Sequence, residues 1–80
     1  MPTVLRIGPY RFQFYAADGH EPPHIHVLRE KSDLKVWLSP VRVARNRGYR
    51  RSEEKRIVRL VSEHRDLLVR RWNENFPRPR

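Results

Sequence analysis

Apolar and polar residues alternate along four short stretches in the first half of the chain, at residues 3–7, 10–15, 24–29 and 34–38. Successive side chains of a β-strand point to opposite faces, so this alternation predicts four strands with one buried face each. The side chains expected on that face in the two clearest stretches are Tyr10, Phe12, Phe14, Leu34, Val36 and Leu38. Gly8-Pro9, Asp18-Gly19 and the polar residues 30–33 predict the turns between the strands.

The pattern is less regular after the fourth strand. Pro40 interrupts the hydrogen-bonding ladder there, because proline has no backbone N–H. Residues 41–44 predict a fifth strand at the edge of the sheet, and a short helix over residues 41–46 is the alternative interpretation. Residues 45–51 predict a loop.

Apolar residues recur at three- and four-residue spacing after Ser52, which is typical of an amphipathic helix. They are Ile57, Leu60, Val61, Leu68 and Trp72, and His64 falls on the same stripe. Ser52 is the predicted N-cap, and Glu53 and Glu54 place negative charge in the first turn. The spacing therefore predicts one helix of about twenty residues, ended by Pro77.

Together these elements predict an α+β fold, in which a curled antiparallel sheet of four to five strands carries one long C-terminal helix on one face. A chain of 80 residues supports one domain with a thin core, so we expect residues 1–80 to form a single domain with a frayed basic tail over residues 77–80. The sequence has no cysteine and no apolar run as long as a membrane span. We therefore expect a soluble cytoplasmic protein.

Positive charge is concentrated in the second half of the chain. The net charge is +9, and residues 41–80 carry thirteen Lys/Arg against five Asp/Glu, whereas residues 1–40 carry five against four. Most of the basic residues are arginine, whose planar guanidinium binds phosphate or carboxylate through two hydrogen bonds. The charge predicts a polyanionic partner, either nucleic acid or an acidic protein, and a merely soluble surface is the alternative.

The sheet face opposite the predicted core combines basic and aromatic side chains. Such a face can hold single-stranded nucleic acid by stacking bases on rings and binding phosphates to Arg and Lys. The predicted nucleic-acid-binding residues, which include the arginines of the following loop, are Arg11, Tyr15, Lys35, Trp37, Arg42, Arg45, Arg47, Arg50 and Arg51. In the alternative interpretation, the rings pack on basic side chains or cover a small secondary core. RNA is favoured over DNA, because the solvent side of the helix offers charge but few polar groups that read bases.

Three of the four histidines lie within seven positions, at His20, His24 and His26. Pro22-Pro23 stiffens the chain before the third strand, so we expect the imidazoles on an exposed, rigid edge. As general acid and base, these three residues would suit RNA cleavage without a metal or other cofactor. As metal ligands, His24 and His26 would need His20 and Glu21 to complete a site. In the third interpretation, the imidazoles only bond the backbone of the turn and keep an edge strand polar.

Several strings of the sequence resemble those of a family of small bacterial proteins known as domain of unknown function 4160. The matching strings are Pro2-Thr3-Val4, Gly8-Pro9-Tyr10-Arg11-Phe12, Asp18-Gly19-His20-Glu21-Pro22-Pro23-His24-Ile25-His26-Val27, Trp37-Leu38, Pro40-Val41-Arg42, Ala44-Arg45-Asn46-Arg47-Gly48-Tyr49 and Glu63-His64-Arg65. The resemblance covers nearly the whole chain and implies no established activity. It implies a neighbouring small protein, in an arrangement similar to toxin and antitoxin operons, and it draws attention to the polar positions His20, Glu21, His24, His26, Arg45, Asn46 and Arg47.

The leading hypothesis is that the protein is an RNA-binding component of a toxin-antitoxin-like pair. In the catalytic version of this hypothesis, the same protein is a ribonuclease that uses His20, His24 and His26. The alternatives are a non-catalytic module that binds nucleic acid or a cognate acidic protein, and a histidine-based metal-binding protein. No membrane partner is expected.

Overall fold

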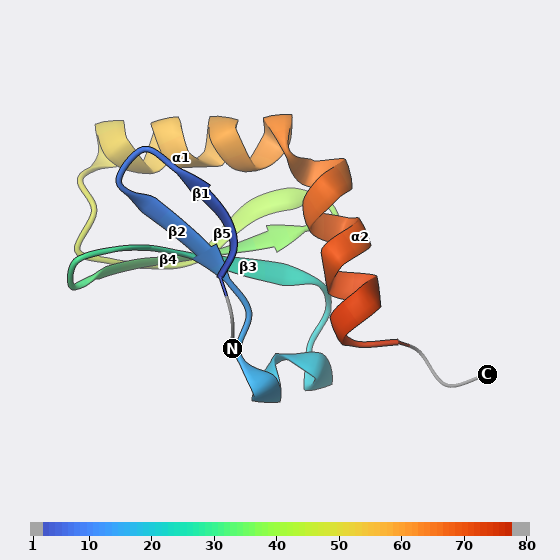
Figure 1. Cartoon of the computed structure of the whole chain (residues 1–80). Helices are drawn as coiled ribbons and strands as arrows, with labels where there is room; N and C mark the ends of the chain where they lie inside the picture. The colour runs from blue at the N-terminus through green and yellow to red at the C-terminus, as the bar shows by residue number, and fades with distance from the viewer. Residues whose placement is uncertain (1–2, 78–80) are drawn as a thin grey trace.

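The computed structural model describes residues 3–77. Five strands pair in chain order to form one antiparallel sheet: β1 (Thr3–Ile7), β2 (Tyr10–Gln13), β3 (His24–Arg29), β4 (Ser32–Leu38) and β5 (Val41–Arg47). A short 3-10 helix, η1 (Ala16–His20), joins β2 to β3, and two helices, α1 (Arg51–Glu63) and α2 (Arg65–Asn75), follow β5 (Figure 1). The predicted α+β class and the antiparallel sheet are confirmed. Residues 78–80 of the predicted basic tail lie outside the described residues.

The core lies between the sheet and the two helices. All six side chains that alternation assigned to the buried face in the second and fourth stretches are buried, with Phe12, Phe14 and Leu34 fully enclosed. Ile25 and Val27 of β3 join them from the middle of the sheet, and the helices complete the core with Ile57, Val61, Leu68 and Trp72. The period of two in the sequence therefore located this face of the sheet correctly.

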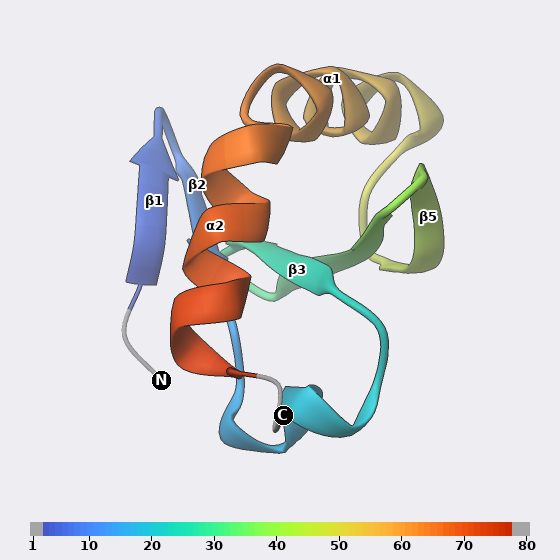
Figure 2. The ribbon, with the colours of Figure 1, turned by 90° about the vertical axis from the view of Figure 1, so that its right-hand side faces the viewer.

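The predicted single long helix is instead two consecutive helices that meet at His64. The backbone N–H of His64 donates to both Leu60 O and Val61 O, and its imidazole Nδ1 bonds Leu60 O at 2.9 Å. The side chain thus competes for a carbonyl of the last turn of α1, which ends the regular helix there. In Figure 2, α1 is seen nearly end-on while α2 runs down beside the sheet, so each helix covers a different part of the core.

The fifth strand is confirmed and is longer than predicted, because β5 continues to Arg47 through residues assigned to a loop. The alternative helix over residues 41–46 is wrong. Pairing with β4 includes a register shift next to Lys35 and Val36, and the strand continues beyond it. Asn46 then closes the turn into α1: its side chain accepts from Tyr49 N, donates to Tyr49 O, and donates to Glu54 Oε2 at 2.7 Å.

Ser52, the predicted N-cap, lies inside the first turn of α1, whose N-cap position is Arg50. Within residues 3–77, no helix is long and apolar enough to cross a membrane.

Candidate functional site

The register of the sheet places the predicted basic and aromatic residues of the strands on one face. Residues directly opposite each other in an antiparallel pair share a face. His24 pairs with Trp37, and Trp37 pairs in turn with Arg42. His26 pairs with Lys35 in the same way. These side chains therefore share the face opposite Ile25 and Val27, as alternation predicted, although α2 reaches that face at His24, whose ring lies 5.1 Å from that of Trp72.

The expectation that the imidazoles lie exposed on this face is wrong. His24 has no exposed surface and His26 is 4% exposed. The Asp18-Gly19 turn is part of the 3-10 helix η1, which lies on the side of the sheet away from α1 (Figure 1). Alternation gave the correct face, but η1 covers that face where the histidines lie.

Asp18 of η1 lies against both imidazoles. Its Oδ1 is 3.2 Å from His24 Nε2, and its Oδ2 is 3.4 Å from His26 Nε2. One donor atom from each of these three residues lies within 4.8 Å of the others. We call Asp18, His24 and His26 the histidine cluster.

The η1 turn itself positions the carboxylate of the histidine cluster. Tyr15 N donates to Asp18 Oδ2 at 2.8 Å, so the turn holds the carboxylate in place. Burial raises the pKa of Asp18, but the Tyr15 amide and the two imidazoles outweigh it and lower this pKa below its usual value. Asp18 is therefore an anion in the folded protein at neutral pH.

The outer nitrogens of the two imidazoles face fixed acceptors. His24 Nδ1 donates to Pro22 O at 2.9 Å, which uses the stiff Pro22-Pro23 turn that precedes the strand. His26 Nδ1 is 3.5 Å from Asp33 Oδ1. Four buried atoms in this region have no hydrogen-bond partner among the described residues, and these are His24 Nε2, His26 Nδ1, His26 Nε2 and Asp33 Oδ1.

Aromatic rings enclose the histidine cluster. The Tyr15 ring lies 4.5 Å from the His26 ring, and the rings of Trp37 and Trp72 lie 5.5 and 5.1 Å from that of His24. These contacts keep water away from the imidazoles and place two tryptophans beside them.

His20 does not join the histidine cluster. It is exposed at the end of η1 and lines a groove with Trp72, Phe76 and Pro77. Glu21 is also exposed, and its carboxylate accepts a hydrogen bond from Lys35 Nζ. The structure thus brings together two of the three predicted catalytic histidines, and it supplies Asp18 where the metal interpretation expected His20 and Glu21.

Besides Tyr15, whose ring packs on His26, two more of the predicted nucleic-acid-binding residues make contacts within the protein. Lys35 Nζ pairs with Glu21 and lies 4.9 Å from the centre of the Trp37 ring. Both Lys35 and Trp37 are partly buried. Their arrangement matches the alternative in which the ring packs on a basic side chain.

The predicted arginines of β5 and of the start of α1 are exposed. They are Arg42, Arg45, Arg47, Arg50 and Arg51. Within residues 3–77, none of their side chains takes part in an ion pair or a side-chain hydrogen bond. Tyr15 is exposed as well, at 38%, and Arg11 on β2 is partly buried. We call the five arginines the arginine row, because they follow one another along β5 and into α1.

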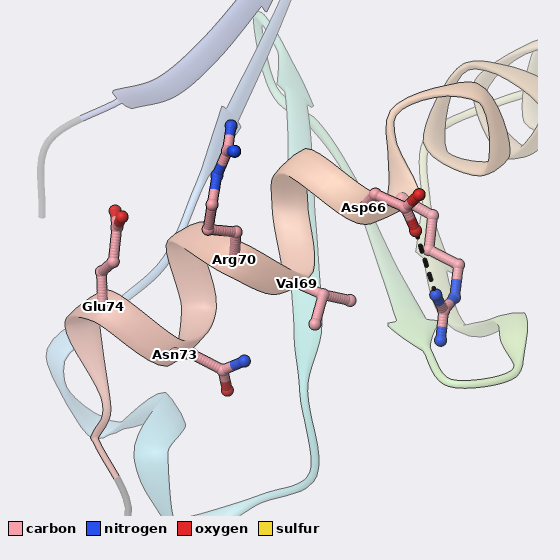
Figure 3. A pocket seen from close by; sticks show the side chains of 6 residues that line it. Asp66, Val69, Arg70, Asn73 and Glu74 are labelled. Carbon is pink, nitrogen blue, oxygen red and sulfur yellow. Dashed lines mark hydrogen bonds and ion pairs between the residues drawn. The ribbon is translucent and has the colours of Figure 1, made fainter.

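A shallow hollow on α2 lies apart from both features. Figure 3 shows the side chains that line it, including Val69, Arg70 and Asn73 from successive turns of the helix. The Arg65 guanidinium at its edge donates to Leu38 O at 2.8 Å and lies 3.4 Å from Asp66, so it fastens α2 to the end of β4. Its carboxylates, Asp66 and Glu74, belong to no metal-ligating cluster among the described residues, so we assign the hollow no function.

Sequence reasoning missed Asp18 and Asp33 as members of the site. Each is a carboxylate in a predicted turn beside a strand that carries His-x-His. The sequence feature that could have pointed to them is an aspartate in each of the two turns that flank this strand. Whether Asp18 contacts the imidazoles depends on the position of η1 over the sheet, which the sequence pattern does not give.

Comparison with known proteins identifies the family. No curated protein and no solved structure matches the chain. The family described as Domain of unknown function (DUF4160) matches residues 10–73, a segment that runs from β2 almost to the end of α2 and includes the histidine cluster and the arginine row. The chain therefore belongs to the DUF4160 family.

Proposed function

We propose that this protein binds single-stranded RNA through the arginine row, as one component of a toxin-antitoxin-like pair. The observation that supports this most directly is the exposure of the row without internal ion pairs. Several carboxylates pair instead with other basic groups, such as Glu53 with Arg29 and Glu21 with Lys35. Phosphates could therefore contact the row without displacing an existing partner.

The geometry of the row suits an extended polyanion. Arg42, Arg45 and Arg47 lie on an edge strand, and Arg50 and Arg51 continue the charge to the N-terminus of α1. The residue spacing of about 3.3 Å along a strand spreads the guanidinium groups over a length comparable to several nucleotides. Exposed Tyr15 offers a ring for base stacking elsewhere on the molecule.

We do not propose the ribonuclease form with His24 and His26 as acid and base. A general base must reach the proton that it removes, and these imidazoles lie beneath η1 with almost no exposed surface. We therefore expect total RNA incubated with the pure protein in EDTA to stay intact. Cleavage in that experiment would contradict a function limited to binding.

The test is a salt titration of binding to a fluorescent single-stranded RNA, comparing wild type with an Arg45→Gln and Arg47→Gln double variant. Each lost phosphate contact lowers the slope of log K against log salt by about 0.7, so the double variant should lose about 1.4. Over about 50 to 200 mM salt, this difference is readily measured.

The matched control is an Arg59→Gln and Arg70→Gln double variant, which removes the same charge from exposed positions on α1 and α2. If the two double variants change the slope equally, net charge and not the arginine row causes binding. If the wild-type protein fails to bind RNA at low salt, the proposal is wrong, and an acidic protein becomes the expected partner of the arginine row.

A further inference from the structure

The histidine cluster contains polar atoms that the protein itself does not satisfy. His24 Nε2 and both ring nitrogens of His26 are buried without a hydrogen bond among the described residues. Burying an unpaired polar group typically costs about 1 to 3 kcal/mol, so native proteins rarely leave several together. Three such nitrogens that face carboxylates require an explanation.

The distances within the cluster are long for hydrogen bonds. A charge-assisted N–H···O bond usually measures about 2.7 to 2.9 Å, whereas Asp18 lies 3.2 and 3.4 Å from the two Nε2 atoms. Ligands bound tetrahedrally at about 2.0 to 2.1 Å from a zinc ion are about 3.3 Å apart. Each imidazole nitrogen therefore lies at about this spacing from one oxygen of Asp18, and one donor atom from each of the three residues lies within 4.8 Å of the others.

The direction of the imidazoles leads to the same conclusion. Pro22 O can only accept, so His24 Nδ1 donates to it and His24 Nε2 is the ring nitrogen directed at Asp18. An imidazole nitrogen and a carboxylate oxygen that face each other can both bind one cation placed between them. His26 has the same arrangement, with Nδ1 toward Asp33 and Nε2 toward Asp18.

We infer that Asp18, His24 and His26 bind a divalent first-row transition-metal ion of the zinc or iron(II) type. Two imidazoles and one carboxylate are a ligand set that such ions accept, and a water molecule would complete the coordination. Pro22 O and Asp33 would orient the outer nitrogens of the two imidazoles, as partners of metal-bound histidines commonly do. The ion's two positive charges balance the carboxylates of Asp18 and Asp33.

The metal's role is to fasten η1 to the sheet. Asp18 comes from η1, whereas His24 and His26 come from β3. Binding would therefore join a 3-10 helix, which alone makes few hydrogen bonds, to a central strand. This role does not depend on RNA binding, because none of the three ligands belongs to the arginine row.

The first experiment uses the full, untagged chain, since a histidine tag would bind metal itself. After incubation with zinc and exhaustive dialysis, we expect one zinc per chain by elemental analysis. Cobalt(II) should give visible absorption bands and quench tryptophan emission, because Trp37 and Trp72 flank His24. A wild-type chain that retains no zinc and gives no cobalt bands would overturn the inference.

Variants then locate the site. Asp18→Asn should abolish the cobalt bands, and Asp33→Asn, which alters only an orienting partner, should weaken zinc binding about 10- to 100-fold. The matched controls are His20→Gln and His64→Gln, which remove the two remaining imidazoles and should leave binding unchanged. Circular dichroism checks that each variant is folded. If Asp18→Asn is unfolded, the Asp33→Asn affinity and the controls decide the outcome.

The competing explanation is that two protons, one on each imidazole, replace the metal's charge. In that case, the wild-type protein would show no stoichiometric zinc and no cobalt spectrum. Loss of metal binding in His20→Gln or His64→Gln, with retention in Asp18→Asn, would also refute the site, because the metal would then lie at surface histidines.

Discussion

Replacing Gly19 by alanine should destabilise the protein through one steric contact. A Cβ atom at position 19 would lie 2.8 Å from Cδ1 of Phe76, closer than real Cβ contacts. Gly19 does not have a positive φ, so alanine is compatible with its backbone. The cost therefore comes from the contact between η1 and the end of α2.

The magnitude follows from two opposing terms. Inserting a methyl group into a packed contact costs about 1 to 3 kcal/mol. Replacing glycine by alanine at a compatible position lowers the entropy of the unfolded chain and contributes about 0.4 to 1 kcal/mol of stability. We expect Gly19→Ala to lower the free energy of unfolding by about 1 to 2 kcal/mol, and each kcal/mol corresponds to about 4 to 8 °C in Tm for a domain of this size.

The decisive measurement is a double-mutant cycle by urea unfolding with Phe76→Ala. Phe76→Ala removes the ring that the new methyl group meets, so Gly19→Ala in that background should become stabilising by about 0.4 to 1 kcal/mol. The control is Gly8→Ala, where no atom lies within 4 Å but φ is +54°, so its cost is backbone strain that Phe76→Ala cannot relieve. If Gly19→Ala costs the same in both backgrounds, the steric explanation is wrong.

Two further predictions concern the links between the sheet and α1. Arg29 donates two hydrogen bonds to Glu53 and Tyr10 donates a third, and these bonds lower the pKa of Glu53. That pKa is lower in the folded than in the unfolded chain, so the contribution of ionised Glu53 to stability is present at neutral pH and lost as pH falls through the folded value. The urea midpoint of Glu53→Gln should therefore change less between neutral and acid pH than that of wild type. The exposed control Glu63→Gln should behave like wild type. Asn46→Asp keeps the shape but loses the donor to Glu54 and sets two carboxylates together, so it should cost about 1 to 3 kcal/mol at neutral pH and less in acid. An equal loss in the exposed control Asn73→Asp would refute the Asn46 explanation.

The sequence predicted the sheet well because its strands alternate strictly. Phe12 and Leu34 could be assigned to the core because a period of two leaves only two faces to choose from. The division of the helix at His64 could not be predicted, since no proline or glycine is present there and the apolar spacing continues through it. The break depends on a side-chain bond to Leu60 O, which only the folded backbone makes possible.

At the candidate site too, local sequence patterns predicted which face each side chain lies on, but not which other segment packs against that face. Alternation correctly placed His24 and His26 opposite Ile25 and Val27, but it carries no information on whether another segment covers that face. Asp18-Gly19 indicates a turn locally, but the position of that turn over the imidazoles depends on tertiary contacts, such as that of Gly19 with Phe76 of the segment after α2. The arginine row, by contrast, was recognisable directly, because a run without acidic residues needs no tertiary contact to be basic.

The uneven packing of the sheet gives a physical reason for a metal on its second face. The apolar core lies on the side covered by α1 and α2, and at the histidines the cover comes from the five-residue η1 together with the Trp72 ring of α2. A segment that short has no buried residue of its own and contributes little hydrophobic stabilisation. Small domains commonly add a disulfide or a metal where the core is thin, and this chain has no cysteine. A divalent ion held by Asp18 and the two imidazoles would attach η1 without apolar burial, so removing the metal should release η1 while the core under α1 remains folded.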